Sequence, residues 1–237
     1  MKKTKIIGIG GLSRSGKDTF VKVAHNILKQ NGYDTCHLAF ATALKNEIQQ
    51  MFRNNNFNLD IWTDDTERKK RLRDLLVWWG CMRRELGDGN YWIDRIQERF
   101  ELIQRTYSQE VLDKSVFFVS DVRFPNESKW IHEKWGGWFI HVKKYSMRYD
   151  NVQTFDDGNV EHSDAMHRMY DSAPNEEEAK QDPLIQEHAD DKLELENVIE
   201  RETRLGNKIT VADLPNNTYL LNEVRLCLAK VPLLKIK

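Results

Sequence analysis

The sequence predicts an α/β protein in which helices cover both faces of a parallel sheet. Short apolar runs typical of buried strands alternate with longer segments whose apolar residues recur every three or four positions. This alternation implies crossover connections, which place parallel strands between two layers of helices. A glycine-rich turn joins the first apolar run to the first helical segment. The length of 237 residues fits one domain with inserted segments.

The first segment of the chain combines a strand, a glycine-rich loop and a helix. Residues 6 to 9 predict a buried strand, and a helical apolar stripe begins at Phe20. Between them, two glycines are followed by Lys17 at the spacing of a phosphate-binding loop. Glycines let the backbone wrap around an anion, consecutive N–H groups form a nest, and the helix N-terminus adds positive potential. The alternative is an ordinary glycine turn between a strand and a helix.

The loop departs from the usual pattern directly after its lysine. The pattern places Ser or Thr there to bind magnesium, whereas this chain has Asp18 and then Thr19. Which of the two contacts the metal therefore stays open. The residues predicted to bind the donor nucleotide are Gly11, Ser13, Arg14, Ser15, Gly16, Lys17, Asp18 and Thr19.

The remaining elements follow from the same periodicities. In the first half, the sequence predicts a strand at 35 to 40 and helices at 42 to 52, 65 to 86 and 91 to 105. In the second half, it predicts strands at 115 to 121, 138 to 142 and 208 to 211, an acidic helical stretch at 176 to 204, and a closing helix at 218 to 230.

Polar residues follow the apolar run at 115 to 121. Asp121 ends this run, and a carboxylate at the end of a buried strand is the usual source of a group near the magnesium ion of a P-loop enzyme. Ligands of such sheets bind at the carboxyl ends of the strands, so we expect Asp121 to face the loop, although a helix N-cap is the alternative role. Arg123 is expected to bind a phosphate in bidentate fashion or to pair with Glu127 at the surface.

Two adjacent arginines, Arg83 and Arg84, end the long predicted helix. Their position suits a helix C-terminus on dipole grounds alone, and it also suits an anion clamp for a second substrate. Trp79 and Trp92 lie near this point, where an aromatic ring would suit a nucleobase next to its phosphate. Core packing is the alternative role for the tryptophans.

The composition is typical of a soluble globular protein, with 40% hydrophobic and 31% charged residues. No run of 18 apolar residues predicts a membrane span, and the short, glycine-interrupted run near the N-terminus does not predict secretion. Three widely spaced cysteines predict reduced thiols and a cytoplasmic location. Residues 150 to 205 carry 17 acidic against 5 basic side chains, so the rest of the chain is basic, which suits phosphate-rich ligands.

Together these motifs resemble the deoxynucleoside monophosphate kinases of bacteriophages, which have the P-loop kinase fold. The resemblance covers residues 5 to 144 and resumes weakly near 211 to 221. It rests on the Gly-Lys-Asp-Thr loop, the segment Ala-Thr-Ala-Leu-Lys that ends at Lys45, the tryptophan-rich helix that leads to Arg84, and the block Ser-Asp-Val-Arg-Phe-Pro-Asn-Glu that ends at Glu127.

The resemblance implies one kinase domain over residues 1 to 237, with a helical acceptor-binding insertion at about 42 to 110 and an acidic lid-like insertion at about 145 to 207. It implies phosphorylation of deoxynucleoside monophosphates to diphosphates, with ATP and Mg²⁺ as cofactors, in the cytoplasm of a host cell if the gene is phage-encoded. Neither a membrane nor a nucleic acid is expected as a partner, and a homodimer is compatible with the sequence.

The residue roles that the resemblance implies fall into three sets. The catalytic residues are Lys17, Arg84, Asp121 and Arg123; the metal-binding residues are Asp18, Thr19 and Asp121; and the acceptor-binding residues are Lys45, Trp79, Arg83, Arg84, Trp92 and Arg123.

Two alternatives stay open at this point. Animal phosphomevalonate kinases have a similar Gly-Lys-Asp loop and a similar Ser-Asp-x-Arg strand end, so the acceptor could be a different small phosphate. A nucleic-acid-dependent NTPase would need a basic helix with interleaved aromatic residues, and residues 67 to 84 partly supply one.

Overall fold

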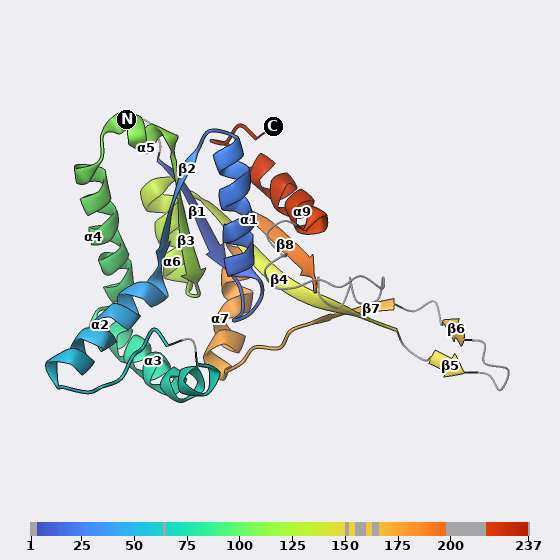
Figure 1. Ribbon diagram of the computed structural model, residues 1–237, viewed down its shortest axis with the longest axis horizontal. Coiled ribbons are helices and arrows are strands. Elements are labelled where there is room, and N and C mark those ends of the chain that lie inside the picture. The colour runs from blue at the N-terminus through green and yellow to red at the C-terminus, as the bar shows by residue number, and fades with distance from the viewer. Residues whose placement is uncertain are drawn as a thin grey trace.

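The computed structural model describes residues 4–63, 65–149, 152–154, 160–162, 166–197 and 217–236 (Figure 1). Its centre is a sheet in which five parallel strands lie in the order β2-β3-β1-β4-β8. These strands are β1 (Lys5–Gly10), β2 (Asp34–Ala39), β3 (Ser115–Val122), β4 (Trp138–Tyr149) and β8 (Asp191–Glu196). The prediction of an α/β fold with a mainly parallel sheet and helices on both faces is confirmed.

Two antiparallel pairings lie beyond the parallel core, of which the first extends the central sheet and the second is a separate two-stranded sheet. The outer end of the long strand β4 pairs with β7 (Met166–Tyr170), and the two strands project from the body of the molecule (Figure 1). Farther out, β5 (Val152–Thr154) pairs with β6 (Val160–His162).

Helices cover the sheet on both faces because successive strand residues point to opposite sides. Ile7, Ile9 and Phe118 pack beneath α1 (Lys17–Gln30) and α9 (Thr218–Ala229). On the other face, buried residues of β1, β3 and β4 pack against a second group of helices. That group includes α4 (Tyr91–Thr106), the π-helical turn η1 (Trp130–Lys134) and α7 (Glu176–Glu187). The short helix α6 (Pro125–Lys129) leads directly into η1.

Two further helices, α2 (Phe40–Asn54) and α3 (Thr66–Leu86), stand at one end of the sheet (Figure 1). A small separate core of Ile48, Phe52 and Ile61 joins α2 to α3. A short helix, α5 (Gln109–Lys114), leads into β3. Helices α2 and α3 lie close to the carboxyl ends of the parallel strands, where a ligand of an open α/β sheet binds (Figure 1).

One predicted element is wrong. The acidic stretch at 176 to 204 was expected to be helical, but the helix ends at Glu187 and the strand β8 follows. Leu193 and Leu195 alternate with charged residues, and both are buried against the sheet core. This period of two is a strand pattern that the high charge of the segment concealed. The strand predicted at 208 to 211 lies outside the described residues.

None of the helices described here is long and apolar enough to cross a membrane.

Candidate active site

The loop between β1 and α1 has the backbone geometry of a phosphate-binding loop. Gly11 has φ +123°, and a Cβ atom added there would lie 2.1 Å from the carbonyl oxygen of Val142. Gly16 has φ +98° and caps the N-terminus of α1. Both positions therefore require glycine, the first because of a close backbone approach and both because of a positive φ. The N-terminus of α1 points its free N–H groups into this loop.

Lys17 is buried at the start of α1. Its Nζ donates hydrogen bonds to the carbonyl oxygens of Gly11, at 2.8 Å, and of Leu12, at 2.6 Å. Burial lowers the pKa of Lys17 below its usual value, and the nearby carboxylate of Asp121 opposes that shift. The ammonium group thus lies against its own loop, at the base of the cavity that it is predicted to serve.

A cavity of about 230 Å³ opens above the loop. Six of the eight residues predicted to bind the nucleotide line it, and Gly11 and Ser15 are buried beneath them. The Ser15 hydroxyl is buried without a hydrogen-bond partner among the described residues. The cavity is lined by Ser13, Arg14, Gly16, Lys17, Asp18, Thr19, Asp121 and Arg123.

The three predicted metal-binding residues all reach this cavity. Asp121 lies at the end of β3 with φ +60°, a left-handed conformation that is uncommon outside glycine. Asp18 is exposed and Thr19 is half-buried at the start of α1. Within the described part of the chain, no three His, Cys, Asp or Glu side chains gather closely enough to hold a metal by themselves. The oxygen donors fit Mg²⁺, which is usually held by one or two carboxylates together with substrate phosphates.

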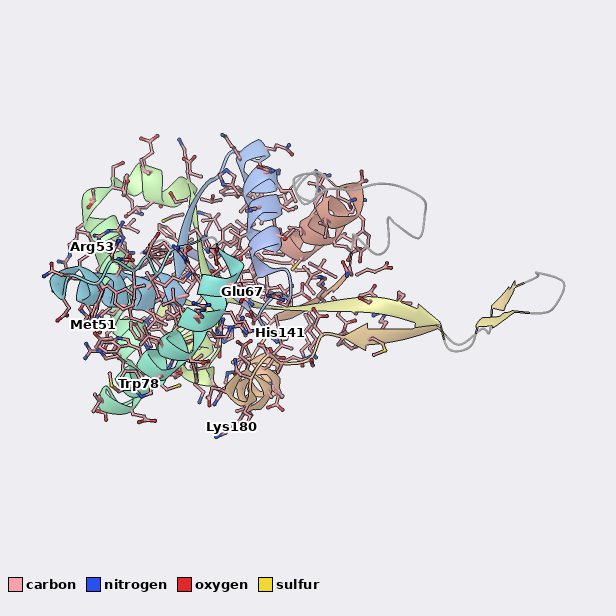
Figure 2. The ribbon with its side chains drawn as sticks, turned by 60° about the horizontal axis from the view of Figure 1, so that its bottom comes forward. Met51, Arg53, Glu67, Trp78, His141 and Lys180 are labelled. Carbon is pink, nitrogen blue, oxygen red and sulfur yellow. The ribbon has the colours of Figure 1, made fainter. Side chains whose placement is uncertain are left out.

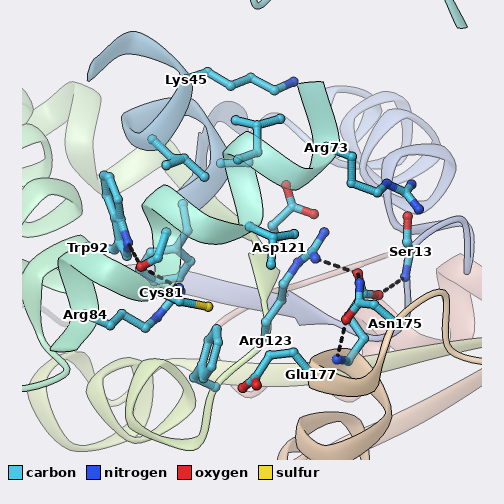
Figure 3. Close-up of a pocket in the computed structure, with 18 of the residues that line it drawn as sticks. Ser13, Lys45, Arg73, Cys81, Arg84, Trp92, Asp121, Arg123, Asn175 and Glu177 are labelled. Atoms are coloured by element: carbon cyan, nitrogen blue, oxygen red, sulfur yellow. Dashed lines mark hydrogen bonds and ion pairs between the residues drawn. The ribbon is translucent and has the colours of Figure 1, made fainter. Parts of the chain in front are cut away.

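A second, larger cavity of about 330 Å³ adjoins the first, and the two share Ser13, Asp121 and Arg123 (Figure 3). Part of its lining is apolar, and the polar part carries five cationic side chains and the carboxylates of Asp121, Glu177 and Glu178. The apolar side chains include Phe40, Leu44, Ile61, Leu72, Leu76, Val77, Trp92 and Phe124. The cationic side chains are Lys45, Lys69, Arg73, Arg84 and Arg123.

Arg84 lines this second cavity and is held there by a buried carboxylate. Its Nη2 donates to Glu127 Oε1 at 2.7 Å, and its guanidinium lies 3.7 Å from the centre of the Phe124 ring. The other oxygen of Glu127 accepts the backbone N–H groups of Arg123 and Phe124. Because Glu127 is only 1% exposed, its charge is compensated within the protein, and Arg84 is pre-positioned.

Arg83, one residue earlier, points elsewhere. Its Nε donates to Glu47 Oε1 at 2.6 Å, and the same carboxylate accepts from Trp79 Nε1 and from the Tyr91 hydroxyl. Of the described residues, neither Arg83 nor Trp79 lines the second cavity. Both were predicted to contact the acceptor, and in the structure both bind the Glu47 carboxylate beside the second cavity.

The other predicted acceptor-binding residues do line the second cavity. Lys45 lines the cavity, and its Nζ atom lies 4.9 Å from the centre of the Trp62 ring. Trp92 is 2% exposed and donates from Nε1 to the Gly80 carbonyl at 3.0 Å, so core packing and cavity lining coexist in this residue.

Sequence reasoning missed four charged residues that line the larger cavity, Lys69, Arg73, Glu177 and Glu178. Lys69 and Arg73 share the face of α3 that carries Arg84. The cavity-lining positions of α3 recur every three or four residues, and this helical periodicity could have indicated that both side chains line the site. Glu177 and Glu178 carried no such signal. Glu127 was considered as the alternative, surface partner of Arg123, but the Arg123 guanidinium pairs with Glu178 of α7 at 2.7 Å, and Glu127 pairs with Arg84.

Comparison with known proteins adds little to this geometry. No protein-family model matches the chain, and no curated protein matches it. Among solved structures, the chain is similar to a dephospho-CoA kinase from Campylobacter jejuni, with 13% identity, a TM-score of 0.34, and coverage of 93% of this chain and 97% of that chain. It is also similar to the protein APE1195, with 16% identity, a TM-score of 0.31, and coverage of 96% and 94%. TM-scores below 0.5 are too low to carry an argument.

Proposed function

We propose that the protein transfers a phosphoryl group from ATP to a deoxynucleoside monophosphate. The observation that carries the proposal is the shared wall of the two cavities. Ser13, Asp121 and Arg123 line both the cavity above the phosphate-binding loop and the larger cavity. A donor phosphate in one and an acceptor phosphate in the other would therefore meet at these three residues.

The chemistry requires little beyond positioning and charge. An acceptor phosphate is already ionised near neutral pH, so no general base is needed, and catalysis depends on alignment and on neutralising the transferred charge. Lys17 and the loop N–H groups would hold the donor phosphates. Mg²⁺, bound by Asp121 together with Asp18 or Thr19, would neutralise charge on the phosphate oxygens.

The larger cavity suits an acceptor with both a phosphate and an apolar, planar part. Arg84 and Arg123 supply guanidinium groups that bind phosphate in bidentate fashion. The Trp92, Phe40 and Phe124 side chains supply aromatic surface in the same cavity. This combination favours a nucleotide over phosphomevalonate, which has no ring to stack.

The nucleic-acid-dependent NTPase remains the second candidate because of the basic residues of α3. Lys69, Lys70, Arg71 and Arg73 of this helix are all exposed to solvent, and Lys69 and Arg73 also line the cavity. The four side chains form a small basic surface, and the two at the cavity could bind a small anionic ligand as well.

One assay separates these candidates. ATP consumption is measured with each deoxynucleoside monophosphate, with phosphomevalonate, and with single-stranded DNA. The proposal predicts turnover that depends on at least one of the monophosphates. Turnover stimulated only by phosphomevalonate or only by DNA would reject it in favour of the corresponding alternative.

A further inference from the structure

The carboxylate of Glu178 lies directly on the phosphate-binding loop. Its Oε2 accepts the backbone N–H of Ser13 at 2.8 Å, and its Oε1 accepts Nη1 of Arg123 at 2.7 Å. The Glu178 side chain is only 10% exposed. The dashed lines in Figure 3 mark these contacts between the loop and the start of α7.

These two donors are the kind of groups that bind phosphate. A loop N–H and a guanidinium are the donors expected for a nucleotide phosphate at such a loop. A carboxylate that accepts both of them reproduces part of the coordination of a phosphoryl group. Because like charges at hydrogen-bonding distance repel, Glu178 and a donor phosphate would not occupy this place together.

Helix α7 holds Glu178 in this position through further contacts. Asn175 caps the helix, accepting the Glu178 N–H at 2.8 Å. One turn after Glu178, Asp182 accepts from Nε2 of the buried His141, at 2.9 Å, and Ile185 is buried in the core. The three side chains recur at spacings of four and three residues, so one face of α7 is docked on the sheet. Figure 2 shows Lys180 on the outer side of this helix.

We infer that Glu178 is an internal competitor for the phosphate-binding loop, which the polyphosphate of the incoming nucleotide must displace. The inference rests on the proposed function, since it assigns a regulatory contact to the same site. Displacement would release Arg123 from Glu178, so the guanidinium becomes available to the transferred phosphoryl group only when a donor is bound. Docking of α7 would thereby couple nucleotide binding to completion of the site.

The size of the effect follows from population arithmetic. The apparent dissociation constant of a ligand equals its intrinsic constant divided by the fraction of molecules able to bind it. If Glu178 holds the two donors in about nine of ten molecules, neutralising it should tighten polyphosphate binding about tenfold.

The test compares Glu178→Gln with Glu176→Gln. Glutamine keeps the shape of Glu178 and leaves its backbone N–H bonded to the Asn175 cap, but it removes the charge that pairs with Arg123. Glu176 lies in the same first turn of α7 and is exposed, so its variant controls for the loss of one negative charge at a helix N-terminus. Dissociation constants for ATP and for inorganic tripolyphosphate are measured by calorimetry with the full chain.

The expected result is about tenfold tighter binding of both ligands to Glu178→Gln and unchanged binding to Glu176→Gln. Unchanged or weaker binding to Glu178→Gln, with wild-type protein that binds ATP, would overturn the inference and leave the proposed function intact. Tighter tripolyphosphate binding without monophosphate-dependent turnover would support the inference and reject the proposed substrate. If the wild-type protein and both variants bind neither ATP nor tripolyphosphate, the inference and the proposed function are both overturned.

Hydrogen exchange gives a second readout that does not depend on a variant. Amides of residues 176 to 187 in the wild-type protein should exchange faster when ATP is added, because the displaced Glu178 no longer anchors the helix. Slower or unchanged exchange there, while ATP protects the loop at 11 to 19, would contradict displacement.

Discussion

The two cavities that meet at Asp121 are built in different ways. The phosphate-binding loop is made by the backbone, through the positive φ of Gly11 and Gly16 and a close approach to β4. The larger cavity is made mainly by side chains from separate helices, and two of its arginines, Arg84 and Arg123, are held by carboxylates. A backbone-made site needs a fixed local sequence, whereas a side-chain-made site needs only a suitable three-dimensional arrangement. The first should therefore tolerate substitution less than the second.

The largest effect is expected in the backbone-made cavity, at Lys17. Lys17→Ala should lower turnover by about 1,000-fold, because it removes the only buried cation at the base of the loop among the described residues. Burial lowers the pKa of Lys17, so its charged form costs folding free energy at neutral pH. The variant should therefore keep a midpoint of thermal unfolding close to that of the wild type. Wild-type turnover in a folded variant would refute the loop assignment.

The next effect concerns Asp121, which belongs to both cavities. Asp121→Asn should lower the magnesium-dependent rate by about 100-fold or more, since a neutral amide is a poor ligand for a hard cation. Asp121→Gly should lose the same activity. Its free energy of unfolding should be about 1 kcal/mol higher than that of the Asn variant, because φ +60° strains a residue that has a Cβ atom. The loss of rate is measured from turnover as a function of Mg²⁺ concentration, and the difference in stability is measured by urea unfolding. A retained rate in Asp121→Asn would reduce Asp121 to a structural role.

The third effect belongs to the side-chain-made cavity. Arg84→Lys should raise the Michaelis constant for the acceptor about 10- to 100-fold and leave that for ATP nearly unchanged, because Lys cannot reproduce a bidentate contact. Lysine keeps a positive charge beside the buried Glu127, so the fold should persist. The matched control is Arg83→Lys, which changes the neighbouring residue on the side facing Glu47. If neither variant alters acceptor kinetics, the acceptor binds elsewhere.

The difference between the cavities also explains what the sequence predicted. The loop, the strand that ends at Asp121 and most helices were read correctly, since each depends on local spacing. The choice between Arg83 and Arg84 depends on the orientation of α3 against α2 and α4, which spacing alone does not determine. Glu178 lies 165 residues from its partner Ser13, and no local pattern marks such a pairing. The strand β8 was missed because charge concealed its alternation.

The smallest predicted effect separates Arg83, which pairs with Glu47, from Arg84, which lines the larger cavity. Arg83 pairs with Glu47 and lies 5.1 Å from the Trp79 ring and 5.0 Å from the Tyr91 ring, with its side chain 33% exposed. Arg83→Ala should lower the free energy of unfolding by on the order of 1 kcal/mol, because the ion pair is partly exposed and Glu47 retains two other donors.

Both Michaelis constants should stay within about twofold of wild type in Arg83→Ala, because this side chain does not line the larger cavity. The loss of a charge-assisted contact to the acceptor would raise the acceptor constant much more. Urea unfolding measures the free energy of unfolding, and steady-state kinetics with both substrates measures the two Michaelis constants. Arg83→Lys keeps a charge at the helix end and should recover part of the lost stability. A tenfold rise in the acceptor constant, without a matching loss of stability, would instead place Arg83 in the binding site.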